Sequence, residues 1–226
     1  MTKRSQLAVS AGLPDLEIWT KRALWLAGLT IAYNVAEGIV AIGFGWGEES
    51  VSLFGFGIDS LIEVGSASLV MWRFRGEQNL APGPGKLRER RATLGIGCLF
   101  VGLALVVAVG AVLQVVTRAH PETTVPGIVV AALSLAFMGW LWRAKRRVAE
   151  ALNSATVAKD ASGSLVCLQL SAVVLAGSVT YALLPELWWA DAVAALLLAV
   201  FIAREGVETI RASRREDFDG GCGCSH

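Results

Sequence analysis

The chain has 226 residues, of which 54% are hydrophobic and only 17% are charged, and its mean hydropathy is +0.57. These values exclude an ordinary soluble domain, which carries more charge and shorter apolar runs. The formal net charge of +1 is close to neutral, but the basic residues are unevenly distributed along the chain.

Apolar runs long enough to cross about 30 Å of hydrocarbon recur along the sequence. They cover residues 23–44, 50–72, 93–116, 125–143, 157–183 and 187–207. The polar segment before the first run lacks the features of a cleaved signal peptide. We therefore predict an all-α membrane protein with six transmembrane helices. Its predicted parts are an N-terminal cytoplasmic segment (1–22), a transmembrane domain (23–210) and a tail (211–226) too short for a folded domain.

Lysine and arginine residues cluster on alternate sides of the predicted spans. They precede the first span, separate the second from the third and the fourth from the fifth, and follow the sixth, whereas the opposite loops, GWGEES, TRAHPETT and LLPEL, contain a single arginine. The positive-inside rule then places both termini in the cytoplasm. Residues 76–91 combine proline, glycine and charge, which predicts a flexible connector. We interpret the basic loops as orientation signals and lipid contacts rather than as a nucleic-acid surface.

Ionisable side chains within the spans are the candidates for function. An Asp, Lys or Arg at the centre of a transmembrane helix costs roughly 2.5–3.5 kcal/mol on insertion scales, so such residues usually mark pathways or sites. The predicted spans contain Glu37, Asp59, Glu63 and Asp160. The spans contain almost no internal lysine or arginine except Lys159, which lies at a cytoplasmic end.

Asp59 and Glu63, in the stretch GFGIDSLIEV, are the most informative pair. At positions i and i+4 they lie on one helix face, about 6 Å apart along the axis. Two like charges in a low dielectric repel, so either one acid is protonated or a cation lies between them. A purely structural acid pair, a basic partner from another span and a water-filled cavity remain alternatives. We favour a cation or proton site.

The other acids have weaker signals. Glu37 lies one turn from Asn34 and could supply a ligand or an interhelical hydrogen bond. Asp160 could cap the start of the fifth span, or it could belong to a polar face with Ser164 and Cys167. About 10 Å of helix separate Asp160 from Cys167, so one ion could hardly bind both.

The tail GGCGCSH contains a separate group of possible ligands, Cys222, Cys224 and His226. Thiolates and imidazole suit soft metals such as Zn(II), Cu(I) or Cd(II). Three ligands in five residues cannot close a rigid tetrahedral site alone. A metal-loading or sensing role and an inert polar terminus are both open.

The sequence resembles the cation diffusion facilitator family of divalent metal transporters. The resemblance covers nearly all of the spans and is clearest in SVSLFGFGIDSLIEVGSASLVMWRF (50–74) and WWADAVAALLLAVFIAREGVETI (188–210). It implies that Asp59 and Glu63 are metal ligands. The partner ligands expected from the fifth span fall on Gly163, which has no side chain, and on Cys167, a thiol that would favour softer metals. Water, Asp160 or Glu37 are candidates for the remaining ligand.

The resemblance also implies proton-coupled efflux of a divalent metal such as Zn, Cd, Co or Fe from the cytoplasm, with the metal as substrate and no cofactor. The expected partners are the metal, protons and the lipid bilayer, with a possible homodimer and no nucleic acid. The expected location is the cell membrane, either bacterial inner or plasma membrane.

Two competing functions are considered. A membrane protease would need acids facing each other from two helices, but both of these acids lie on one helix, and His120 and His226 lie outside the spans; we therefore expect no enzyme. The alternative is a membrane-anchored soft-metal sensor or metal-handling protein built around the tail.

Overall fold

The computed structural model describes residues 3–47, 51–75, 84–119 and 125–222. Within these ranges the chain forms helices and no strands. They are α1 (Lys3–Gly47), α2 (Val51–Arg75), α3 (Pro84–Thr117), α4 (Val125–Leu152), α5 (Ala155–Leu183), the short 3-10 helix η1 (Pro185–Leu187) and α6 (Ala190–Arg214). The all-α prediction is confirmed.

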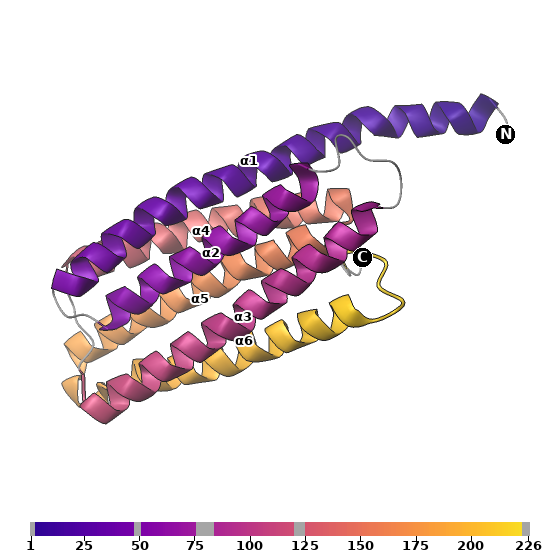
Figure 1. Ribbon diagram of the computed structural model, residues 1–226. Coiled ribbons are helices and arrows are strands. Elements are labelled where there is room, and N and C mark those ends of the chain that lie inside the picture. Colours follow the sequence, from indigo (N-terminus) through magenta and orange to yellow (C-terminus); the bar gives the residue numbers. More distant parts are fainter. Residues whose placement is uncertain (1–2, 48–50, 76–83, 120–124, 223–226) are drawn as a thin grey trace.

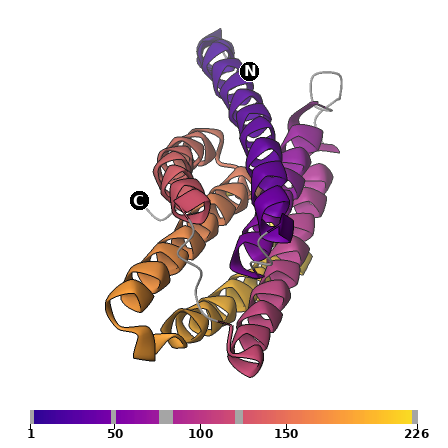
Figure 2. The same cartoon turned by 90° about the vertical axis from the view of Figure 1, so that its left-hand side faces the viewer.

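Helices α2 and α5 contact each other in the middle of the bundle. Helices α1 and α4 pack along one side of them, and α3 and α6 pack along the other, as Figures 1 and 2 show. The beginning of α1 and the end of α6 lie at the same end of the bundle (Figure 1). The acids predicted on α2 therefore lie on a central helix that faces several others.

The helices extend beyond the apolar runs that predict them. Helix α3 already begins at Pro84, so residues 84–91 are helical and the flexible connector predicted over 76–91 is wrong for that part. Helix α4 continues past the predicted end at residue 143 to Leu152. Arginine, lysine and glutamate are good helix formers, whereas hydropathy detects only the apolar part of a helix. This correction moves Lys145 from a predicted loop into a helix.

The turn between α4 and α5 is fixed by two residues. Asn153 adopts a positive φ of 46°, and the Ser154 amide bonds back to the Ala149 carbonyl at 3.1 Å, which is a Schellman-type helix end. The Ser154 hydroxyl accepts from the Val157 amide and so caps α5. Ser154, and not Asp160, is therefore the N-cap of this helix.

Small residues bring α3 and α6 into close contact. A Cβ atom at Gly97 would lie 2.9 Å from Ile210 Cγ1 and 3.1 Å from the Gly206 carbonyl oxygen. At Gly206 a Cβ would lie 3.0 Å from the Gly97 carbonyl oxygen. Backbone packing at paired small residues is typical of helices in lipid.

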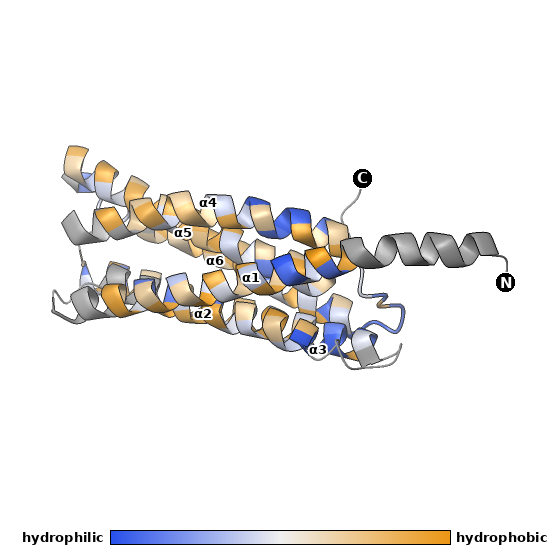
Figure 3. Ribbon diagram, turned by 90° about the horizontal axis from the view of Figure 1, so that it is seen from above, coloured by the Kyte–Doolittle hydropathy of each residue, from blue (hydrophilic) through white to orange (hydrophobic). Residues whose placement is uncertain are grey.

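Large apolar side chains cover much of the outside of the bundle. Leu105 and Phe201 are 66% and 68% exposed, for example, whereas Asn34, Ser134 and Asp160 are buried. This inside-out distribution is the one expected in hydrocarbon, where polar groups face the bundle interior. Hydrophilic residues gather toward the end of the bundle where the chain termini lie (Figure 3).

Three helices in the described part of the chain are long and apolar enough to cross a membrane by themselves. They are Leu16–Ala41, Gly85–Thr117 and Ala155–Leu183. Helices α2, α4 and α6 contain charged residues that lower their hydropathy. The protein is a membrane protein with several spans. The count of six spans and the cytoplasmic location of both termini remain predictions.

Candidate metal centre

The paired acids of α2 point into the bundle. Asp59 and Glu63 are each only 2% exposed, although their helix also presents exposed residues such as Leu61 to the outside. Glu63 lies at the contact between α2 and α5, because its Oε2 accepts a hydrogen bond from Ser164 Oγ at 3.1 Å. The predicted one-turn spacing therefore places both carboxyl groups inside the protein.

A buried lysine lies beside this pair. Lys145 of α4 is 1% exposed, and its Nζ lies 2.8 Å from Asp160 Oδ2 and 3.6 Å from Glu63 Oε2. The same ammonium group donates to Ser164 Oγ at 3.0 Å. The expectation that the interior of the bundle contains almost no basic residue apart from Lys159 is therefore wrong at Lys145. Helix α4 continues beyond its apolar run, and Lys145 lies in that continuation.

Asp160 belongs to this interior cluster rather than to a helix cap. Besides Lys145, it accepts a hydrogen bond of 2.6 Å from Ser66 Oγ of α2. The cluster thus joins α2, α4 and α5 through one ammonium group and two carboxylates. Lys159 points elsewhere and pairs with Glu205 of α6 at 2.7 Å.

Asp59 is in a different environment from Glu63. The buried Cys167 thiol lies against the Asp59 carboxyl group, and Cys167 Sγ is 3.7 Å from Ser134 Oγ of α4. Within the described part of the chain, the buried oxygen Asp59 Oδ2 has no hydrogen-bond partner. A buried acceptor without a donor is costly, so this oxygen is available to a cation or a proton.

Glu37 of α1 is a further buried acid in this interior region. Its carboxylate accepts from Ser60 Oγ at 3.0 Å and from the Tyr33 hydroxyl at 3.2 Å, and the Ser134 side chain also lies near it. One turn away, Asn34 Oδ1 is a second buried oxygen without a partner among the described residues. Glu37 is thus hydrogen-bonded on both oxygens, whereas Asp59 is not.

Gly163 makes room for the carboxylate of Glu63. A Cβ atom at this position would lie 2.6 Å from Glu63 Oε1 and 3.4 Å from Phe100 Cε1. The absence of a side chain there, which the resemblance presents as a missing ligand, has a local physical reason. The space of that side chain is taken by Glu63 itself.

The predicted ligands share one interior region but do not converge on one point. Among the described residues, no group of three or more His, Cys, Asp or Glu side chains has the arrangement of a metal site. Asp59 and Cys167 lie together, whereas Lys145 holds Glu63 and Asp160. Sequence reasoning missed Lys145 and Ser134, although their separation of eleven residues places both on one face of a continuous helix.

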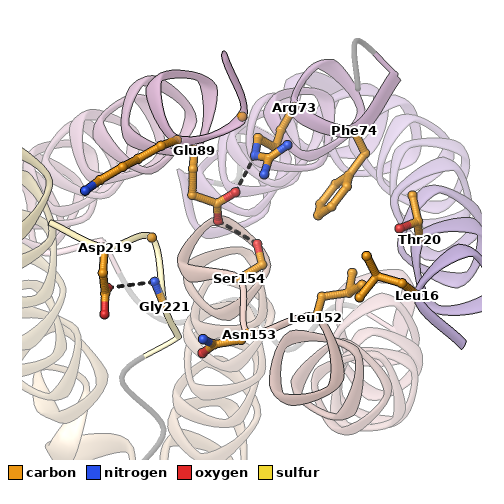
Figure 4. A pocket seen from close by; sticks show the side chains of 13 residues that line it. Leu16, Thr20, Arg73, Phe74, Glu89, Leu152, Asn153, Ser154, Asp219 and Gly221 are labelled. Atoms are coloured by element: carbon orange, nitrogen blue, oxygen red, sulfur yellow. Dashed lines mark hydrogen bonds and ion pairs between the residues drawn. The ribbon is translucent and has the colours of Figure 1, made fainter. Parts of the chain in front are cut away.

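A second buried polar cluster lies near the end of the bundle where the termini meet. Glu89 of α3 accepts hydrogen bonds from Arg73 Nε of α2, from Ser154 Oγ at 2.6 Å and from the Thr156 amide at 2.8 Å. It borders a cavity of about 380 Å³ that also touches Asp219 of the tail (Figure 4). This cluster fastens helix ends and is separate from the acids of α2.

The tail is described only as far as Cys222. Its backbone folds back onto the α4–α5 turn, where the Ala155 amide bonds to the Gly220 carbonyl at 2.9 Å and the Cys222 amide bonds to Asn153 Oδ1 at 3.1 Å. Cys224 and His226, the other candidate tail ligands, lie outside the described residues. The tail metal site remains a hypothesis.

The sequence matches known proteins over most of its length. Residues 27–216 match the family model of the cation efflux transmembrane domain. The chain is also similar to Transmembrane protein 163 of Xenopus laevis, with 26% identity over 196 residues that cover 87% of this chain and 69% of that protein. The matched residues include Glu37, Asp59, Glu63 and Asp160, and the family resemblance predicted from the sequence is confirmed. This chain therefore belongs to the cation efflux family of membrane transporters.

Proposed function

We propose that the protein carries a divalent metal cation across the membrane and that Asp59, Glu63 and Cys167 bind it. The observation that carries this proposal is the buried carboxyl group of Asp59, which has one oxygen without a partner among the described residues and lies against a thiol. A buried acid of this kind is stabilised when a cation arrives. Membership of a cation efflux family supports the same conclusion.

The donor atoms favour borderline and soft metals. A thiolate beside carboxylates suits Zn²⁺ and Cd²⁺ better than hard cations, which prefer all-oxygen sites. In this proposal Glu63 joins Asp59 and Cys167 when the metal binds, and water completes the coordination. Asp160 and Glu37 are weaker candidates, because both already have hydrogen-bond partners on each oxygen.

Proton exchange is the proposed driving reaction. Thiol and carboxyl ligands must lose their protons to bind a metal, so metal binding releases protons and protonation releases metal. We propose efflux from the cytoplasm through the cell membrane, with the bilayer and protons as the other partners, a homodimer as the assembly and no nucleic acid. The cytoplasmic face would be the end of the bundle rich in basic residues.

The test is metal flux into proteoliposomes with an imposed pH gradient. The native chain is expected to carry Zn²⁺ and Cd²⁺, and Asp59→Asn to reduce flux to the level of empty vesicles, because an amide cannot carry the charge that holds the metal. Asp217→Asn is the matched control, since Asp217 lies in the exposed tail and its loss should leave flux unchanged. Flux that survives Asp59→Asn but disappears with Cys222→Ser/Cys224→Ser would replace this proposal by the tail-based one.

A further inference from the structure

Lys145 is a basic side chain that lies among the buried acids to which the proposed function assigns the metal. It lies within ion-pair distance of two of the buried acids, and 1% of its surface is exposed. Burying an ammonium group costs several kcal/mol unless it is paired. Its presence therefore needs the acids around it, and those acids are among the candidate ligands.

The contacts of Lys145 are unequal. The distance of 2.8 Å to Asp160 Oδ2 is that of a close ion pair, and Asp160 Oδ1 is occupied by Ser66. The distance of 3.6 Å to Glu63 Oε2 is longer than a normal hydrogen bond. Asp160 is thus held firmly as the counter-ion of Lys145, whereas Glu63 is held loosely.

The remaining contacts decide which oxygens a metal can reach. Glu63 Oε2 also accepts from Ser164, and Glu63 Oε1 lies in the space left by Gly163. Lys145 and Ser164 therefore draw Glu63 toward α5. Asp59, with its unpartnered Oδ2, faces no such competitor among the described residues.

We propose that Lys145 is an internal cation that competes with the metal for Glu63 and keeps Asp160 out of the ligand set. This inference rests on the proposed function, because it assumes that Asp59 and Glu63 bind the substrate. Lys145 acts through the acids and touches no metal, so it is a positioning residue. Lys145 has two effects on the proposed site. It weakens metal binding, which allows the metal to leave, and it disfavours hard cations, because these would use the Asp160 oxygens.

The test is equilibrium binding of Cd²⁺ and Co²⁺ to the purified full chain in lipid nanodiscs. Lys145→Gln is expected to lower the Cd²⁺ dissociation constant at least about tenfold, because a positive charge near Glu63 is lost. It should also reduce the preference for Cd²⁺ over Co²⁺, since Asp160 becomes available. Lys145→Arg keeps the positive charge and is therefore expected to keep the native preference for Cd²⁺ over Co²⁺.

A double variant separates this role from a structural one and protects the test against misfolding. Lys145→Gln/Asp160→Asn replaces the ion pair by two amides that can bond each other and Ser66. It is expected to bind Cd²⁺ more tightly than the native chain, because Glu63 has lost its competitor, while its metal preference stays native. A native Cd²⁺ dissociation constant in this variant would overturn the proposal and leave Lys145 as a structural counter-ion.

Two controls distinguish failure of this inference from failure of the proposed function. Lys159→Gln removes another lysine ion pair, the one with Glu205 of α6, and should not change Cd²⁺ binding. If Lys159→Gln tightens Cd²⁺ binding as much as Lys145→Gln does, the effect is one of general charge and the inference is overturned.

The second control is Asp59→Asn, which should abolish Cd²⁺ binding. If Asp59→Asn abolishes Cd²⁺ binding and the Lys145 variants bind Cd²⁺ like the native chain, only the inference about Lys145 fails. If Cd²⁺ binding does not depend on Asp59, both the proposed function and the inference fail.

Discussion

At the scale of single residues, we expect the thiol of Cys167 to set the metal preference of the proposed site. Cys167 is fully buried and lies against Asp59. Replacing it with serine keeps a small polar side chain but exchanges sulfur for oxygen. We expect Cys167→Ser to weaken Cd²⁺ binding about tenfold or more and Co²⁺ binding much less, because the softer metal depends more on sulfur.

Competition between the two metals for the purified chain would measure this difference. Cys98→Ser is the control, because Cys98 is exposed on α3. This variant should bind both metals with native affinity. Equal weakening of Cd²⁺ and Co²⁺ by Cys167→Ser would mean that the sulfur is not a ligand.

Gly163 allows a second prediction at the scale of one atom. A Cβ at this position would lie 2.6 Å from Glu63 Oε1, so Gly163→Ala must push the Glu63 carboxylate away. We expect Cd²⁺ affinity to change several-fold. The midpoint of thermal unfolding should change little, because the end of a side chain can shift and alanine favours a helix by about 1 kcal/mol over glycine.

Gly102→Ala provides the comparison for this substitution. Apart from its chain neighbours and the nearby backbone of its own helix, no atom of the described structure lies within 4 Å of a Cβ built at Gly102, so the variant gains helix propensity without a clash. It should bind Cd²⁺ like the native chain. A Gly163→Ala protein that also binds like the native chain would exclude Glu63 Oε1 from any role in the site.

The sequence could predict part of this centre. Asp59 and Glu63 stand out because two acids interrupt an apolar run, and the structure buries both. Lys145 could not be predicted in the same way, because the surrounding segment, RAKRR (143–147), is basic and resembles a loop. The partners of Asp160 depend on contacts among three helices, and no spacing along one helix encodes them.

At the scale of helices, Glu89 is a buried residue that joins three helices. It connects α3 to α2 through Arg73 and to the start of α5 through Ser154 and Thr156. We expect Glu89→Gln to lower the stability of the bundle by roughly 3 kcal/mol, because it leaves the Arg73 charge without its carboxylate in a buried place. Thermal unfolding in detergent would measure the loss.

Glu150→Gln is the matched control for Glu89→Gln. Glu150 pairs with Arg146 at 3.2 Å on the exposed face of α4, where such pairs contribute about 0.5 kcal/mol or less. Similar unfolding midpoints for the two variants would contradict the role of Glu89 as a buried fastening point.

In the part of the chain that the structure describes, the order of the long helices could be predicted from hydropathy, but their ends could not. The six predicted runs correspond to α1 through α6. The helices are longer because their charged ends continue the same hydrogen-bond pattern, which hydropathy does not detect. This difference matters for function, since the buried Lys145 lies in the part of α4 beyond the predicted span.

At the scale of the whole molecule, the arrangement of helices predicts a definite orientation. Helices that run alternately up and down place the ends of α3 and α5 together, opposite the end of α6 (Figure 1). The helix ends and connections near the former contain few basic residues, whereas the helix ends near the latter contain many. The positive-inside rule therefore predicts that the α3 and α5 ends face outward.

Cysteine labelling in intact cells can test this orientation. In a chain with its native cysteines changed to serine, we expect a membrane-impermeant maleimide to label Thr117→Cys and Glu186→Cys but not Asp217→Cys. All three positions are exposed in the structure, so a difference in labelling reports the side of the membrane and not burial. In permeabilised cells the maleimide should label all three positions.

Labelling of Asp217→Cys alone in intact cells would invert the orientation, and with it the proposed direction of transport. Labelling of only one of Thr117→Cys and Glu186→Cys would contradict six spans, because two outward connections require that α3, α4 and α5 all cross.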